Sequence, residues 1–135
     1  MIKILIEENS AIPSEVLEFA KKIDFDDLSN LVSKHLNAGS SIKLIPGEIK
    51  QEYNGHYYIP AESGELKDKC GIMSEVFESV KIELFRSSIT TSKNTGELYL
   101  WCTPHFSFNM KEGGSNSIEI CTAIFTEKDG WNIRW

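Results

Sequence analysis

Hydrophobic and polar residues are most clearly patterned in the last third of the chain. Aromatic and β-branched residues form four runs there, at 97–103, 105–110, 117–126 and 131–135, and turn sequences at 111–116 and 127–130 separate the later ones. Such residues favour strands. Asp129-Gly130 stands immediately before Trp131, and this dipeptide is typical of a tight hairpin because the turn needs a positive φ. We predict an antiparallel meander with strands over 98–110, 117–126 and 131–135.

The N-terminal part shows helical spacing instead. Apolar side chains recur along 12–23 and again along 25–36, one helical turn apart, which predicts amphipathic helices over 13–23 and 25–37. Asp24 is placed to cap the second helix, with Asp27 supplying a carboxylate in its first turn. Two successive amphipathic helices need a surface on which to bury their apolar faces, and the predicted sheet provides one.

Shorter strands are predicted between these two regions. Residues 1–7 alternate as a strand at the sheet edge, and 42–45 form a strand that ends before Pro46. Asn54-Gly55 predicts a two-residue hairpin between 48–53 and 56–59. That register places Gln51 opposite Tyr58, and it places Ile49, Tyr53 and Tyr58 on one face.

The segment 60–88 is harder to assign. Residues 60–71 are polar and contain glycine, so we expect a surface connection. The next residues fit both a helical stripe and a strand alternation. Their β-branched content favours a strand from about 76 to 91, and a helical turn over 72–77 stays open.

Length and composition indicate one domain spanning 1–135, with 41% hydrophobic and 25% charged residues. No apolar run is long enough to span a bilayer, and no secretory signal is visible, so we expect a cytoplasmic protein. The three cysteines are odd in number and widely spaced, which fits neither a disulfide framework nor a zinc motif. We expect Cys102 and Cys121 to be small buried hydrophobes.

The net charge is −6, with a calculated pI near 5.1. Nucleic acids and anionic membranes select basic surfaces, so the charge disfavours both as partners. It is compatible with a basic protein partner. The three histidines show no metal-ligand spacing, and no phosphate-binding loop or nucleophile motif is present, so we expect neither a metal nor a cofactor.

The order of long strand, turn with Gly96, aromatic strand, Gly113-Gly114 turn and Asp129-Gly130 hairpin resembles the C-terminal half of the NTF2-like superfamily, also called SnoaL-like or cystatin-like. That resemblance implies an α+β fold in which two N-terminal helices pack on a curved antiparallel sheet. The N-terminal half departs from the family, because it opens with a strand and carries a hairpin where a third helix commonly stands.

A second resemblance is to bacterial toxin-immunity proteins of the contact-dependent growth inhibition type, which are small, acidic and free of catalytic motifs. It implies that the chain binds and neutralises a toxin protein, such as a basic nuclease domain. The candidate partner-binding residues combine acids with aromatics: Asp24, Asp26, Asp27, Tyr57 and Tyr58. The oligomeric state stays open, as does the role of an accessory assembly domain.

An alternative follows from the first resemblance. Alternation places Tyr99, Trp101, Thr103 and His105 on one face of a strand, and on a concave side they would line a pocket. SnoaL-like isomerases and cyclases use an acid–base pair in such a cavity, so His105, Tyr99 and Trp101 are the candidate catalytic residues of this alternative. No paired carboxylate is evident in the core strands, and we therefore expect binding rather than catalysis.

Overall fold

A computed structural model describes residues 3–4, 12–36, 42–51, 56–66 and 77–135. It contains two helices, α1 (Ser14–Lys22) and α2 (Phe25–Leu36), and a large, mainly antiparallel sheet. The predicted α+β class is therefore confirmed. The strands are β1 (Lys3–Ile4), β2 (Ile45–Pro46), β3 (Glu48–Gln51), β4 (Tyr57–Tyr58), β5 (Ala61–Glu62), β6 (Phe77–Thr91), β7 (Leu98–Met110), β8 (Ser115–Glu119), β9 (Thr122–Thr126) and β10 (Gly130–Arg134).

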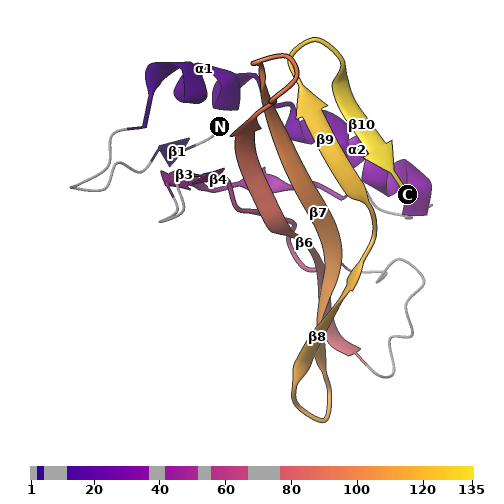
Figure 1. Cartoon of the computed structure of the whole chain (residues 1–135). Coiled ribbons are helices and arrows are strands. Elements are labelled where there is room, and N and C mark those ends of the chain that lie inside the picture. The colour runs from indigo at the N-terminus through magenta and orange to yellow at the C-terminus, as the bar shows by residue number, and fades with distance from the viewer. Residues whose placement is uncertain (1–2, 5–11, 37–41, 52–55, 67–76) are drawn as a thin grey trace.

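The long β6–β7 pair is the centre of the sheet. The hydrogen-bonded order is β1-β3-β4-β6-β7-β9-β10, with β2, β5 and β8 joined at the sides. Every described pair is antiparallel except β1–β3, which is parallel. Figure 1 shows the β7–β8 hairpin projecting away from the end of the molecule that carries α1. The strand predicted from about 76 is confirmed as β6, and the alternative helical turn at 72–77 lies almost wholly outside the described residues.

Aromatic rings connect both helices to the C-terminal strands. Phe19 of α1 contacts Phe125 of β9, with ring centroids 6.0 Å apart, and Phe125 contacts Trp131 of β10 at 5.2 Å. Trp131 in turn lies 6.2 Å from Phe25 of α2. These rings form one connected series of contacts between α1, β9, β10 and α2, and burying such apolar surface is favourable.

The start of α2 follows the predicted capping. The Oδ1 atom of Asp24 accepts a hydrogen bond from the Asp27 N–H at 2.9 Å, which satisfies one of the free donors of the first turn. Farther along, the buried Ser29 hydroxyl donates to the Phe25 carbonyl at 2.7 Å and accepts the Leu44 N–H at 2.8 Å. This hydroxyl ties α2 to the segment that leads into β2.

The segment 42–58 differs from the predictions in two ways. The strand expected at 42–45 is replaced by β2, which includes Pro46. A proline is tolerated there because β2 lies at the side of the sheet, where the missing proline N–H is not needed for a hydrogen bond between strands. Gln51 pairs with Tyr57 rather than Tyr58, so the hairpin register is one residue off and Ile49 and Tyr58 lie on opposite faces. Its Tyr53-Asn54-Gly55 tip lies outside the described residues.

The described part of the expected surface connection, 60–66, is not purely surface. Ala61 belongs to β5, and Ser63 and Leu66 are buried with it. The backbone N–H groups of Ser63 and Leu66 donate to carbonyls of β6, at 2.8 Å each. The composition of this segment did not indicate its burial, because the buried side chains are two small residues and one leucine, and the remaining residues are polar.

The turns of the meander are confirmed. Gly130 has φ +69°, in the left-handed region that the hairpin requires, and Gly113 and Gly114 also have positive φ in the β7–β8 turn. The predicted strand over 117–126 is interrupted, however. It is divided into β8 and β9, which pair with different halves of β7.

Apart from a register shift near its far end, between Phe77 and Ser79, the ladders on both sides of β7 are irregular opposite Thr103 and Pro104. On β6 the register shifts by one residue at Phe85, between the pairs Leu84–Pro104 and Arg86–Thr103. On the other side the break between β8 and β9 falls at residues 120–121, facing the same point of β7. Pro104 has no N–H to give to the ladder, and an extra residue on each neighbouring strand accommodates it.

Candidate functional site

The three predicted contact aspartates lie at the junction of the helices. Asp24, Asp26 and Asp27 are exposed. The backbone carbonyl of Asp24 accepts a 2.6 Å hydrogen bond from the Trp131 indole, so this acidic turn is held against β10. Asp24 is both a helix cap and a surface charge.

The two predicted contact tyrosines point to opposite faces of β4. Tyr57 packs against the hydrophobic core, whereas Tyr58 pairs with Ser88 on the face away from it. Between β4 and β10 there are four strand-to-strand steps of about 4.8 Å, so the tyrosines lie roughly 19 Å across the sheet from the aspartates. The structure does not bring the two groups together into one patch.

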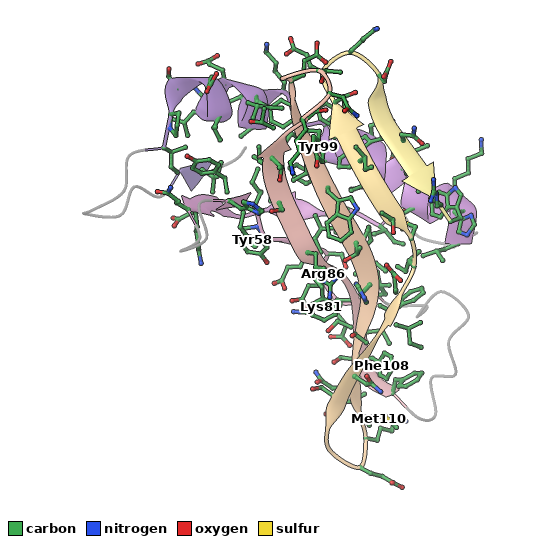
Figure 2. The ribbon with its side chains drawn as sticks, in the orientation of Figure 1. Tyr58, Lys81, Arg86, Tyr99, Phe108 and Met110 are labelled. Carbon is green, nitrogen blue, oxygen red and sulfur yellow. The ribbon has the colours of Figure 1, made fainter. Side chains whose placement is uncertain are left out.

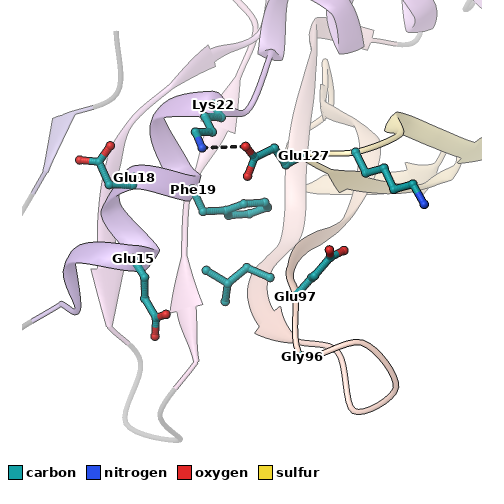
Figure 3. Close-up of a pocket in the computed structure, with 9 residues that line it drawn as sticks. Glu15, Glu18, Phe19, Lys22, Gly96, Glu97 and Glu127 are labelled. Atoms are coloured by element: carbon teal, nitrogen blue, oxygen red, sulfur yellow. Dashed lines mark hydrogen bonds and ion pairs between the residues drawn. The ribbon is translucent and has the colours of Figure 1, made fainter.

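A different cleft gathers acidic side chains, and Figure 3 shows it from close by. It lies between α1, the β6–β7 turn and the β9–β10 turn and has a volume of about 780 Å³. We call it the acidic cleft. Its lining comprises Glu15, Glu18, Phe19, Lys22, Gly96, Glu97, Leu98, Glu127 and Lys128.

Ion pairs neutralise only part of the acidic cleft. Lys22 binds Glu127 at 2.7 Å, and Lys21 on the outside of α1 lies 3.7 Å from Glu18. Among the ion pairs of the described residues, none involves Glu15 or Glu97. Exposed pairs of this kind add little stability, but the unpaired carboxylates leave a negative field in the cleft.

No sequence pattern indicates the acidic cleft. Its carboxylates come from α1 and from two turns that follow about 80 and 110 residues later, and each looks like an ordinary solvated charge in its own segment. The Phe19–Phe125 contact and the Lys22–Glu127 ion pair bring α1 to the β9–β10 turn. A correct tertiary arrangement was needed to find it.

The candidate residues of the enzyme alternative lie on the open face of the sheet. Leu100 and Cys102 of β7 belong to the buried core that both helices share, so Tyr99, Trp101 and His105 point to the other face. The predicted alternation is thus confirmed, but this face is the one turned away from the helices. Figure 2 shows Tyr58, Arg86 and Tyr99 along it.

His105 has carboxylates on both sides, which the sequence did not reveal. It pairs with Glu83 on β6 and with Glu119 on β8. These carboxylates are cross-strand neighbours in a register that strand patterns do not determine, and none of the ion pairs among the described residues joins either of them to His105. The Thr103 carbonyl lies 2.8 Å from His105 Nδ1, which assigns the ring proton to that nitrogen.

A second concavity surrounds these residues. We call it the outer hollow; its volume is about 440 Å³, and it is lined by Phe85, Arg86, Trp101, Thr103, His105, Ser117 and Glu119. A smaller hollow of about 210 Å³ adjoins it and shares Phe85, Arg86 and Trp101. Phe85 packs edge-on against the His105 ring, with centroids 4.6 Å apart.

Neither described cysteine has the character of a nucleophile. Cys102 and Cys121 are buried free thiols, as predicted, while Cys70 lies outside the described residues. Burial raises the pKa of Cys121 to about 11 and raises the pKa of Cys102 further still. Both thiols therefore stay protonated and unreactive near neutral pH.

Within the described ranges, no cluster of three or more His, Cys, Asp or Glu side chains has the geometry to hold a metal ion. No helix in the described part of the chain is long and apolar enough to cross a membrane. Comparison with known proteins finds no matching family model, no matching curated protein and no matching solved structure.

Proposed function

We propose that the chain is an inhibitor of the immunity-protein type, which binds and neutralises a toxin protein through the acidic cleft. The observation that supports this most is the cleft itself. Four carboxylates from three segments surround an apolar floor formed by Phe19 and Leu98. Such a site is built for a long cationic side chain presented by another protein.

The chemistry of the acidic cleft fits an inserted lysine or arginine. The aliphatic stem of such a residue would lie on Phe19 and Leu98, and its charged head would reach Glu15 and Glu97. These two carboxylates have no ion pair among the described residues, so the partner would not have to displace an internal cation. Arginine would gain more than lysine if it binds one carboxylate with both ends of its planar group.

The surrounding surface extends the same charge. Asp24, Asp26 and Asp27 lie just beyond the end of α1 and are exposed. Toxic nucleases hold phosphates and therefore have basic clefts, so a protein of net charge −6 would be attracted to such a cleft from a distance. In this proposal the aspartates speed the encounter, and the acidic cleft holds the docked residue. Tyr58 lies outside the contact.

We also infer that the fold is a variant of the NTF2-like arrangement, with a curved sheet around the helices. The antiparallel order β6-β7-β9-β10 and the two bulges opposite Pro104 support this, because bulges bend a sheet. The parallel β1–β3 pair would then be an addition to that arrangement.

Co-expression with the neighbouring reading frame in the genome tests the function. A toxin encoded there should be retained by the tagged chain, and cells should grow. The double variant Glu15→Lys/Glu97→Lys should lose retention and protection. The matched control is Glu78→Lys/Glu112→Lys, which changes net charge equally at exposed positions near the β7–β8 end of the molecule. Equal loss in both double variants, or no retained protein, would contradict the proposal.

A further inference from the structure

The outer hollow contains an arginine that forms no ion pair with the described residues. Arg86 is exposed, and none of the ion pairs found among the described residues involves it. In a chain that is acidic overall and has only two arginines, this is a local positive centre on the open face of the sheet. A guanidinium group presents several N–H donors in one plane, and its natural complement is a carboxylate or a phosphate.

The floor of the outer hollow contains a polar group that forms no hydrogen bond with the described residues. Thr103 is 3% exposed, and its Oγ1 atom has no hydrogen-bond partner in the part of the chain that the structure describes. Thr103 is the cross-strand neighbour of Arg86, so both side chains leave the sheet on the same face, next to each other. Because the Thr103 oxygen is itself inaccessible, it makes the floor beneath Arg86 polar and is not a group that a bound molecule contacts.

The irregular ladder is what creates this arrangement. The extra residue on β6 places Phe85 and Arg86 together at the edge of the hollow, where a regular strand would send them to opposite faces. Bulges of this kind are common next to binding sites, because they change the direction of a side chain. The break between β8 and β9 faces the same point of β7 and places Glu119 and Ser117 on the far rim.

The walls indicate which anion fits. Phe85 and Trp101 supply aromatic surface on either side of Arg86, and the volume of about 440 Å³ lies in the range of small-molecule sites. Glu119 lines the hollow, and Glu83 lies on the other side of His105. These carboxylates would repel a doubly charged phosphate more than a singly charged group.

The geometry points to a binding site for a small aromatic monocarboxylate on the open face of the sheet. Its carboxylate pairs with Arg86, and its ring lies against Trp101. The site is separate from the acidic cleft and does not depend on the proposed inhibitor function. It assigns a role to Arg86, which the sequence patterns did not single out.

Titration of the isotope-labelled full chain with sodium benzoate tests this site. The measured quantity is the NMR signal of the Trp101 indole N–H, assigned by its loss in Trp101→Phe. Benzoate should shift this signal saturably, while benzamide, which has the same shape without the charge, should bind at least tenfold more weakly. Phosphate should give no saturable shift. Comparable binding of benzamide, or tighter binding of phosphate, would overturn the assignment.

Two arginine variants complete the test. Arg86→Gln should weaken benzoate binding at least tenfold, and Arg86→Lys should weaken it less, because a single ammonium keeps the charge without the planar pair of donors. Arg134→Gln, which removes the other arginine of the chain from an exposed position on β10, should bind as the unmodified chain does. Unchanged binding in Arg86→Gln, or equal weakening in Arg134→Gln, would refute the site.

Discussion

Replacing Phe125 by alanine tests how the helices are held on the sheet. Phe125 is 6% exposed, and its ring touches Phe19 of α1 and Trp131 of β10. Trp131 touches Phe25 of α2, so the change removes the middle of a chain of rings that joins both helices to β9 and β10. No other single side chain contacts both Phe19 and Trp131 among the described ring contacts.

The expected loss is about 3–5 kcal/mol in the free energy of unfolding. Nearly the whole ring is buried, so almost the full transfer free energy is lost, and the two neighbouring rings limit how far the cavity collapses. A domain of this kind has a total stability of about 5–15 kcal/mol, so the loss is a large fraction of it.

Urea denaturation followed by circular dichroism measures this loss. With a slope of about 2 kcal/mol per molar urea, the midpoint should fall by about 2 M. The matched control is Phe85→Ala, the same change at a side chain that is 42% exposed, which should cost less than about 1 kcal/mol. If Phe125→Ala shifted the midpoint no more than Phe85→Ala, the proposed packing of α1 on β9 would be wrong.

Three further predictions concern single side chains. Asp24→Ala should cost about 1 kcal/mol in urea denaturation by removing the cap on Asp27, and Asp24→Asn should recover most of it. Ser29→Ala should cost about 1–3 kcal/mol in thermal denaturation, because the Leu44 N–H loses its 2.8 Å acceptor. Burial raises the pKa of Cys121 from 9.0 to about 11, so its alkylation by iodoacetamide, followed by mass spectrometry, should accelerate about tenfold per pH unit from about pH 8 to 10. The native state favours the neutral thiol, so its contribution to stability is lost as pH rises from about 9 towards 11. A labelling rate that levels off near pH 9 would contradict the burial.

Local patterns sufficed for the elements whose signals are local. The stripe that includes Phe19 and the capping pair Asp24–Asp27 predicted the helices, and alternation with Gly130 predicted the meander. The predicted hairpin register was wrong, because the Asn54-Gly55 dipeptide indicates that a turn is present but not how many residues the turn contains.

The two concave surfaces depend on contacts between distant segments. The acidic cleft exists because Glu15 and Glu97 meet only after α1 docks on the sheet. The outer hollow exists because two neighbouring strands each bulge around Pro104, and no periodic pattern signals a register shift. The prediction of acidic and aromatic contact residues rests on residue type, which carries no information on whether the residues share a surface.

The rate of association with the toxin from the adjacent reading frame tests the acidic cleft most directly. The unmodified chain should associate roughly tenfold faster at about 50 mM than at about 500 mM sodium chloride, because salt screens the attraction. Glu15→Lys/Glu97→Lys should associate roughly tenfold more slowly at low salt and show a weaker salt dependence, while Glu78→Lys/Glu112→Lys should stay within about threefold of the unmodified chain. Equal on-rates for the two double variants at every salt concentration would contradict the proposed function of the acidic cleft.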